Sequence, residues 1–166
     1  MNIFYGGAFN PPTKAHIDII RKISMNPDDK VVVGITDHDY KQTNYTYEQR
    51  IEMMRIAMQC HARRMTEITL VRQYARTWRF LASCDTIPKI DAIVVGEDEW
   101  NDIRERKWQY SSTLLENYNF IVIPRKDFIS STSVRDFIAQ GRSYDEQIAC
   151  YIDEPVYELA VRYMKS

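Results

Sequence analysis

The stretch GGAFNPPTKAHIDII, residues Gly6–Ile20, decides the fold of this chain. It follows the apolar residues Ile3–Tyr5, which predict a strand, and leads into a periodicity that predicts a helix over Thr13–Ile23. A glycine turn lets the backbone approach a ligand closely, and the free N–H groups of a helix N-terminus attract an anion. Thr13 and His16 lie three residues apart, so both side chains can face the same ligand. The segment therefore predicts a phosphate site, in an enzyme or a sensor of nucleotides.

The composition indicates one globular domain over 1–166. Apolar residues make up 45% of the 166 residues and charged residues 27%, which is ordinary for a packed domain. The net charge of −1 provides no overall attraction for nucleic acid. No apolar stretch approaches the ~20 residues that span a membrane. We therefore expect neither nucleic acid nor a membrane as a partner.

The cysteines and the first residues indicate the compartment. Cys60, Cys84 and Cys150 are far apart and form no Cys-x-x-Cys pair, so neither a disulfide framework nor a thiolate metal site is expected. The first residues show no basic leader followed by an apolar block, so we expect no export signal. These patterns predict a cytoplasmic protein.

Short apolar stretches alternate with amphipathic segments, which predicts an α/β fold with an open, parallel, five-stranded sheet and helices on both faces. Thr46 and Gln49 form a capping-box pattern, and Gly141 is a helix stop. The expected strands are Asn2–Tyr5, Lys30–Thr36, Glu67–Val71, Asp91–Val95 and Phe120–Pro124. The expected helices are Thr13–Ile23, Tyr47–His61, roughly Tyr74–Cys84, a short one after Asp98, Ser131–Gln140 and Pro155–Met164.

Four of the five glycines fall at or near the carboxyl ends of expected strands. Open α/β sheets bind their ligands at that edge, where the strand order reverses. The alternative is that these glycines only make tight strand-to-helix turns. The four are Gly6, Gly7, Gly34 and Gly96.

A second polar cluster, ISSTSVR, spans Ile129–Arg135. Its hydroxyl residues, Ser130–Ser133, open an expected helix, and Arg135 follows Thr132 by three residues. Hydroxyl groups and N-terminal amides donate to phosphate oxygens, and a guanidinium binds them with two parallel hydrogen bonds. Alone, the cluster could be a serine-rich helix cap. Paired with the first segment at one sheet edge, it predicts a second half of the phosphate site.

Together the two clusters resemble the paired signatures of the nucleotidyltransferase superfamily that carries the Thr/His-x-Gly-His motif. Within it, the chain is most similar to nicotinamide and nicotinate mononucleotide adenylyltransferases. VVGEDEW, residues 94–100, resembles their Gly-x-Asp element, and Trp108 with NFIVIPRKD, residues 119–127, resembles their Trp and the strand after it. Two positions depart from the pattern: Ala15 replaces the usual glycine, and Glu97 replaces a small residue. The resemblance implies a Rossmann-like nucleotidyltransferase fold.

The resemblance also implies roles for individual residues. Thr13, His16 and Arg135 would be catalytic, and Mg²⁺ would be held by ATP oxygens, with no dedicated protein metal site. ATP and its phosphates would also contact Gly6, Gly7, Ala8, Phe9, Lys41, Gly96, Asp98, Ile129, Ser130, Ser131 and Thr132. The mononucleotide would contact Asn10, Lys41, Trp108 and Arg125. Trp78 lies in a segment expected to pack a helix against the sheet, and stacking on the mononucleotide is the alternative role for its ring.

The implied reaction is attack by the mononucleotide phosphate on the α-phosphorus of ATP, with release of pyrophosphate. This phosphate is already ionised near neutral pH, because its second pKa is about 6, so no general base is needed. Two alternatives remain open. The HIDII wording, residues 16–20, and the chain length also suit phosphopantetheine adenylyltransferase or another transferase of the superfamily. A non-catalytic nucleotide sensor is the second alternative, and the sequence leaves both a homo-oligomer and the choice of amide or acid on the pyridine ring open.

Overall fold

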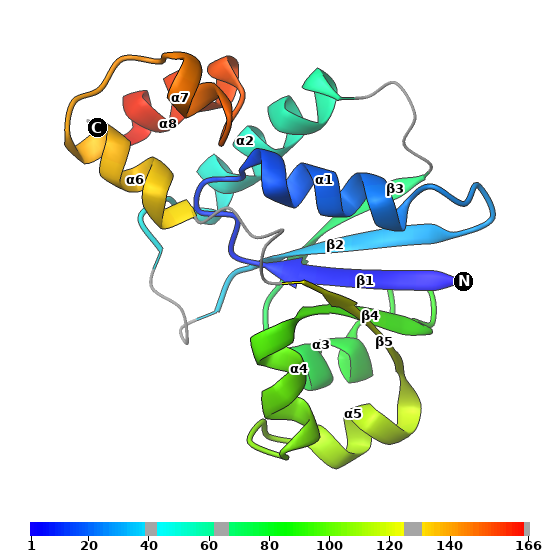
Figure 1. Ribbon diagram of the computed structural model, residues 1–166. Coiled ribbons are helices and arrows are strands. Elements are labelled where there is room, and N and C mark those ends of the chain that lie inside the picture. The colour runs from blue at the N-terminus through cyan, green and yellow to red at the C-terminus, as the bar shows by residue number, and fades with distance from the viewer. Residues whose placement is uncertain (39–42, 62–66, 125–130, 165–166) are drawn as a thin grey trace.

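The computed structural model describes residues 1–38, 43–61, 67–124 and 131–164. Its centre is a sheet of five parallel strands in the order β3-β2-β1-β4-β5 (Figure 1). The strand order reverses between β1 and β4, which is where open α/β sheets bind ligands. The strands are β1 (Asn2–Gly7), β2 (Lys30–Thr36), β3 (Ile68–Gln73), β4 (Ala92–Gly96) and β5 (Asn119–Ile123).

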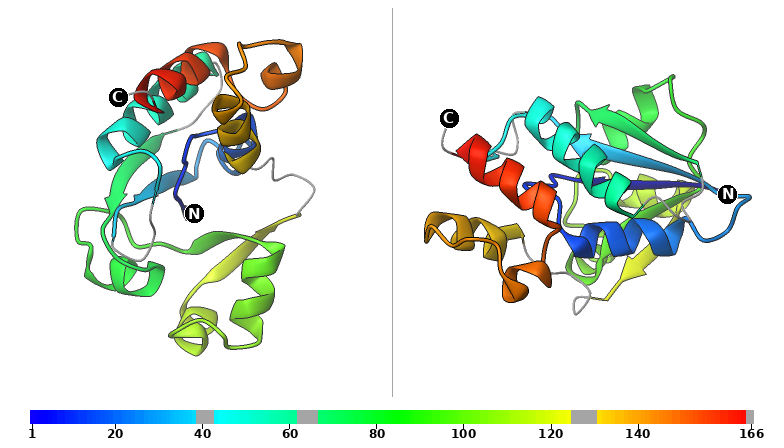
Figure 2. Two further views of the ribbon diagram at one scale, coloured as in Figure 1. Left: turned by 90° about the vertical axis from the view of Figure 1, so that its left-hand side faces the viewer. Right: turned by 90° about the horizontal axis from the view of Figure 1, so that it is seen from above.

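Helices cover both faces of the sheet, as Figure 1 shows. One face carries α1 and α2 with the C-terminal helices, and α8 lies against α2 (Figure 2). The other face carries α3, α4 and α5. The helices are α1 (Lys14–Ile23), α2 (Tyr47–Cys60), α3 (Thr77–Ser83), α4 (Glu97–Arg104), α5 (Ser111–Asn117), α6 (Ser131–Ala139), α7 (Glu146–Ala149) and α8 (Glu154–Met164).

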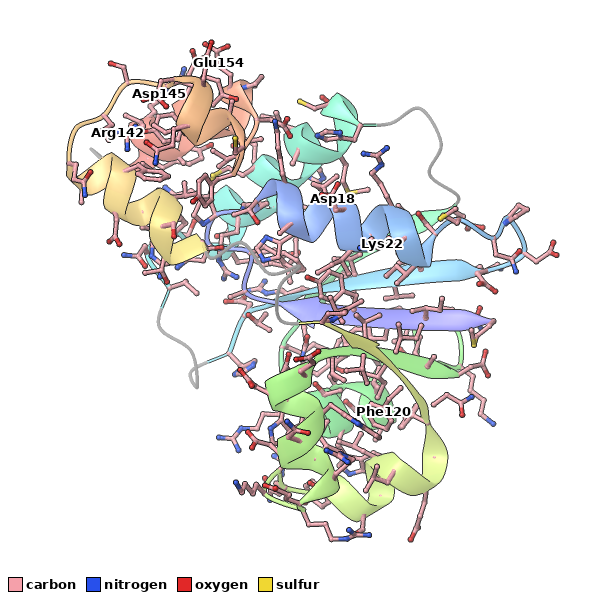
Figure 3. The ribbon with its side chains drawn as sticks, viewed as in Figure 1. Asp18, Lys22, Phe120, Arg142, Asp145 and Glu154 are labelled. Atoms are coloured by element: carbon pink, nitrogen blue, oxygen red, sulfur yellow. The ribbon has the colours of Figure 1, made fainter. Side chains whose placement is uncertain are left out.

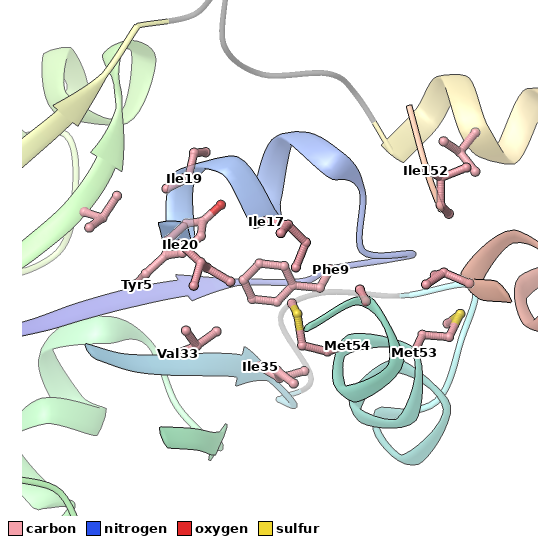
Figure 4. Close-up of a cluster of buried hydrophobic side chains, with 14 of the residues drawn as sticks. Tyr5, Phe9, Ile17, Ile19, Ile20, Val33, Ile35, Met53, Met54 and Ile152 are labelled. Carbon is pink, nitrogen blue, oxygen red and sulfur yellow. The ribbon is translucent and has the colours of Figure 1, made fainter. Parts of the chain in front are cut away.

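Side chains of the central strands point alternately to the two faces of the sheet and form a separate core on each face. In β1, Ile3 and Tyr5 join the cluster under α1 and α2, whereas Phe4 joins the cluster under α3–α5. Figure 4 shows the first cluster, in which Ile17 of α1 and Met54 of α2 lie near Phe9. Central strands that are buried on both faces read as continuous apolar runs, which is why they were visible in the sequence.

The α/β fold, with its open, parallel five-stranded sheet and helices on both faces, is confirmed. Each of the five expected strands is present, and the ends differ from expectation by no more than two residues. The capping box of Thr46 and Gln49 is confirmed, because the Gln49 N–H donates to Thr46 Oγ1 at 3.2 Å. Gly141, expected as a helix stop, has φ of 70°, where a side chain would be strained.

Three expectations about helices were wrong. The third helix begins at Thr77 and not near Tyr74, because Tyr74–Arg76 carry the chain from the end of β3 to the helix. The helices α5 and α7 were missed, since stretches of seven and four residues are too short to show a periodicity. An ion pair between Arg142 and Asp145, 2.7 Å apart (Figure 3), precedes α7 at a place that composition alone did not mark.

Candidate active site

The loop after β1 shapes the first half of the site. Phe9, only 2% exposed, has φ of 50° and packs edge-on against the rings of Tyr5 and His16 at centroid distances of 5.4 and 4.9 Å. Two buried prolines follow, and Thr13 is the N-cap of α1. The loop thus holds the His16 ring against the end of β1.

The hydrogen bonds of His16 define its protonation state. The Thr13 N–H donates to His16 Nδ1 at 2.9 Å, so this nitrogen is an acceptor and carries no proton. Burial lowers the pKa of the imidazole to about 4. Near neutral pH the ring is therefore neutral, with its proton on Nε2. It acts as a hydrogen-bond donor and not as a positive charge.

The start of α6 docks on the same loop. Arg135 Nη1 donates to the Asn10 carbonyl at 2.6 Å, and Ser131 Oγ donates to the Pro11 carbonyl at 2.8 Å. Arg135 Nη2 also donates to Thr132 Oγ1 at 3.0 Å. The two clusters that lie about 120 residues apart in the sequence therefore meet in space. We call the region of residues 6–16 and 131–135 the phosphate corner.

Arg50 fixes the back of this corner. Its guanidinium group, on a residue only 2% exposed, donates to the carbonyls of Ala8 at 2.9 Å, Thr36 at 2.7 Å and Tyr45 at 3.1 Å. Asn10 reinforces the same arrangement, because its Oδ1 accepts the N–H groups of Asn44 and Tyr45, both at 3.1 Å. In this structure the Asn10 side chain, expected to contact the mononucleotide, holds one loop to another.

The C-terminal helices brace the start of α1. The Lys14 N–H donates to the Tyr151 carbonyl at 2.7 Å, and Lys14 Nζ donates to the Ala149 carbonyl at 2.5 Å. Lys14 Nζ also lies 3.9 Å from Asp153. The ammonium of Lys14 is thus directed to the α7–α8 connection, whereas His16 is held by the loop.

A cavity of about 670 Å³ lies between the carboxyl edge of the sheet and the helices α3–α5. Gly6 and Gly7 border it, so it adjoins the phosphate corner. Its wall is aromatic: Trp78 and Tyr110 lie 6.0 Å apart between ring centroids, and Trp108 lines the same space. Trp108, expected at the mononucleotide, and Trp78, for which stacking on it was the alternative role, therefore face one cavity, which we call the acceptor cavity.

Charge is distributed unevenly around the acceptor cavity. Arg76, Arg79 and Lys107 line it, and all three are exposed, so they form its rim. Apolar strand residues and two buried polar ones, Thr36 and Gln73, line the sheet side. The charged groups that line the cavity, which include the carboxylate of Glu99, thus lie at its exposed rim, and the sheet side is uncharged.

The first turn of α4 borders the acceptor cavity. Gly96 is the N-cap of this helix, and its N–H donates to Glu99 Oε1 at 3.2 Å. Glu99 lines the cavity, while Asp98, expected near ATP, lies exposed in the same turn. Trp100 packs on Phe120 with ring centroids 5.1 Å apart, and its half-buried side chain lies against the core under α3–α5.

Some site residues fall outside the described ranges, and others escaped the sequence analysis. Lys41, Arg125, Ile129 and Ser130 lie outside the described residues. Thr36, Gln73 and Tyr110 line the acceptor cavity but were not expected there. The sequence carried a signal for Thr36 and Gln73, because they are polar residues at the carboxyl ends of parallel strands, where open α/β sheets bind their ligands.

The described residues contain no group of three or more His, Cys, Asp or Glu side chains placed to hold a metal ion. Over the same ranges, no helix is both long and apolar enough to cross a bilayer.

Comparisons with known proteins agree with this geometry. A protein of Acholeplasma laidlawii, described as a probable nicotinate-nucleotide adenylyltransferase, is 28% identical over 77% of this chain and 69% of its own length. A phosphopantetheine adenylyltransferase of Moorella thermoacetica is 43% identical over 51 residues, 31% of each chain. The nicotinic acid mononucleotide adenylyltransferase of Plasmodium falciparum, complexed with NaAD, has the same fold, with a TM-score of 0.75 and 19% identity over 98% of this chain and 95% of its own.

The cytidylyltransferase-like family matches residues 4–138, a range that runs from β1 into α6 and contains both halves of the phosphate corner. The match confirms the resemblance to nucleotidyltransferases that the two clusters indicated. The chain belongs to the cytidylyltransferase-like family.

Proposed function

We propose that the protein is an adenylyltransferase that joins ATP to a pyridine mononucleotide, forming a dinucleotide and pyrophosphate. The observation that carries the proposal is the shared border of two sites. Gly6 and Gly7 line the acceptor cavity, and two residues further along, Phe9 packs on His16 in the phosphate corner. The phosphate of a mononucleotide bound in the cavity therefore extends toward the ATP phosphates at the end of β1.

The acceptor cavity suits a pyridine mononucleotide. A volume of about 670 Å³ is within the usual range for small-molecule sites. The rings of Trp78, Trp108 and Tyr110 offer faces on which a pyridine ring stacks. The exposed cations at the rim attract the acceptor phosphate.

The chemistry follows from the charges. An oxygen of the acceptor phosphate forms a bond to the α-phosphorus of ATP, the bond from that phosphorus to the bridging oxygen breaks, and pyrophosphate leaves with the electron pair. Catalysis rests on positioning two anions and stabilising the charge that grows on the leaving group. The neutral His16 donates a hydrogen bond from Nε2. Arg135 offers five N–H donors, more than its two contacts use, beside the N-terminal amides of α6.

Mg²⁺ is part of the proposal, as a cation carried by ATP. Acidic residues of the α4 first turn are exposed near the cavity. When bound, the ion neutralises phosphate charge. Lys41, Arg125, Ile129 and Ser130 keep their expected roles in nucleotide binding on the strength of the family resemblance, as do Gly96 and Asp98. A cytoplasmic location and the absence of nucleic-acid partners are part of the same proposal.

The relatives support this choice and name its competitor. The proteins from Acholeplasma and Plasmodium are named for nicotinate mononucleotide, whereas the shorter match from Moorella is named for phosphopantetheine. The 43% identity of that short match is the observation that favours phosphopantetheine as the second candidate acceptor. The aromatic wall of the cavity favours the pyridine.

The test is a product analysis. The protein is incubated with ATP and Mg²⁺ and separately with nicotinamide mononucleotide, nicotinate mononucleotide and phosphopantetheine, and the products are separated by chromatography. We expect a pyridine dinucleotide and an equal amount of pyrophosphate. Dephospho-coenzyme A as the only product would establish phosphopantetheine as the acceptor. The absence of product with all three acceptors would leave a non-catalytic nucleotide sensor as the remaining hypothesis.

A further inference from the structure

Two buried polar atoms on the floor of the acceptor cavity have no hydrogen-bond partner within the described part of the chain. They are Thr36 Oγ1 and Gln73 Oε1, on residues that are 6% and 3% exposed. Buried polar atoms without partners are rare in folded proteins. Both residues line the cavity, so a ligand that reaches its floor lies beside them.

The sheet places these two atoms together. Thr36 and Gln73 are the last residues of β2 and β3 and pair directly across the sheet. The Gln73 side chain reaches across the strands, because its Oε1 lies 2.5 Å from the point where a Cβ on Gly6 would be and 3.0 Å from that point on Gly34. Two glycines therefore leave the room that this amide oxygen occupies.

The orientation of the Gln73 amide is fixed by its other end. Gln73 Nε2 donates to the Ala75 carbonyl at 3.0 Å. The flipped amide would set two carbonyl oxygens against each other, so Oε1 is the atom that faces the glycines. The floor thus presents one pure acceptor, Gln73 Oε1, beside a hydroxyl that donates or accepts.

Charge decides which ligand group suits this floor. Within the described ranges, the arginine and lysine side chains that line the cavity are Arg76, Arg79 and Lys107, and all three are exposed at the rim. A carboxylate on the floor would face the lone pairs of Gln73 Oε1, away from these cations. A buried anion that faces the lone pairs of an acceptor is disfavoured, whereas a neutral amide can satisfy both orphaned atoms.

We infer that Thr36 and Gln73 bind the carboxamide of nicotinamide mononucleotide and select it over the nicotinate form. The amide nitrogen of the ligand donates to Gln73 Oε1, and the amide oxygen accepts from the Thr36 hydroxyl. The inference rests on the proposed function and assigns its acceptor substrate. It differs from the nicotinate named for the relatives from Acholeplasma and Plasmodium.

The test compares kcat/KM for the two mononucleotides on one preparation, so that the ratio is independent of the fraction of protein that is folded. We expect the wild-type protein to favour the amide by roughly 10- to 100-fold, the range for an unpaired buried polar group. Gln73→Met removes the acceptor while keeping the side-chain length, and it should bring the ratio toward one. Thr36→Val removes the hydroxyl at constant shape and should lower the ratio by roughly 3- to 10-fold.

Thr36→Ser is the matched control, since it keeps the hydroxyl and should keep the ratio. If Gln73→Met does not fold, the kcat/KM ratios of Thr36→Val and Thr36→Ser test the inference instead. A wild-type preference for nicotinate, or an unchanged ratio in Gln73→Met or Thr36→Val, would overturn the inference and leave the proposed function standing. Absence of any dinucleotide with both acceptors would instead remove the proposed function, and the inference with it.

Discussion

The two sides of β1 differ in how their polar groups are satisfied. In the phosphate corner, Arg135, Ser131 and Thr13 are all held by hydrogen bonds to the loop or to its neighbours. Across the strand, the acceptor cavity keeps two buried polar atoms without partners and ring faces exposed to the cavity. The polar groups of the corner are held in place by the protein itself, whereas two buried atoms of the cavity have hydrogen-bonding capacity that the described residues do not meet.

The largest effect is expected from replacing His16 in the phosphate corner. His16→Ala should lower kcat by roughly 10²- to 10³-fold, with ATP affinity changed much less, because its hydrogen bond acts on charge that grows in the transition state. Steady-state kinetics and ATP titration measure the two quantities. Both mononucleotides should lose rate equally, since the corner does not contact the pyridine.

Asp18→Ala is the matched control for His16→Ala. Asp18 lies on the same helix, exposed to solvent (Figure 3), and its removal should leave kcat within about twofold. A His16→Ala protein that loses only ATP affinity, at unchanged kcat, would indicate a nucleotide sensor or a uniform binding role.

The second prediction concerns the scaffold behind the corner. Arg50→Met should lower the free energy of unfolding by about 3 kcal/mol, because it removes the donors to three carbonyls around a buried site. Urea unfolding followed by circular dichroism measures the change. Arg55→Met, on the exposed side of α2, should change it by no more than about 0.5 kcal/mol; equal effects at both positions would contradict the assigned role.

The third prediction is a pH dependence of stability. Burial holds the pKa of His16 at about 4, below the value of 6.5 that applies in the unfolded chain. Between these values the unfolded chain binds a proton that the folded protein does not, so stability is full above about pH 6.5 and falls as the pH drops toward 4. The His16 contribution lost is about 2 kcal/mol, after a discount because the ring is only partly shielded from solvent.

Chemical denaturation of the wild type and of His16→Gln at pH 7.5, 5.5 and 4.5 measures this contribution. Glutamine does not titrate, so the difference between the two proteins should shrink or reverse as the pH falls. A difference that stays constant across the three conditions would show that the imidazole is accessible to protons in the folded state.

The fourth prediction concerns the cavity floor. A Cβ on Gly34 would lie 2.7 Å from Phe4 Cζ and 3.0 Å from Gln73 Oε1. Gly34→Ala should therefore cost about 1 to 2 kcal/mol of stability by overpacking, and it should raise KM for the mononucleotide more than KM for ATP. Equal increases in both KM values would show that the corner and the cavity are not separate sites.

The same contrast explains how much could be predicted from the sequence. The strands of the sheet were visible because continuous apolar stretches such as VVVGI have no other place in a domain of this size. The phosphate corner was visible because glycines, a helix start and an arginine act through local backbone geometry. The sequence therefore points to His16 and Arg135, and the structure shows both hydrogen-bonded to the loop after β1 or to the residue that caps α1.

The floor of the acceptor cavity could not be found in this way. Gln73 becomes a ligand-facing group only because Gly6 and Gly34, on two other strands, leave room beside it. Tyr110 reaches the cavity through a left-handed backbone, with φ of 66°, ahead of a helix too short to show a periodicity. Asn10 was assigned to the ligand by resemblance, although its side chain is engaged in joining two loops.

The attachment of α6 to the loop after β1 has a consequence for biosynthesis. Ser131 and Arg135 contact Pro11 and Asn10, so the loop after β1 is completed by a helix that follows β5 in the chain. A nascent chain that stops short of Ser131 already contains every strand of the sheet and the imidazole, yet lacks the guanidinium that closes the corner. A growing polypeptide thus contains the strands of its sheet before it can complete the corner.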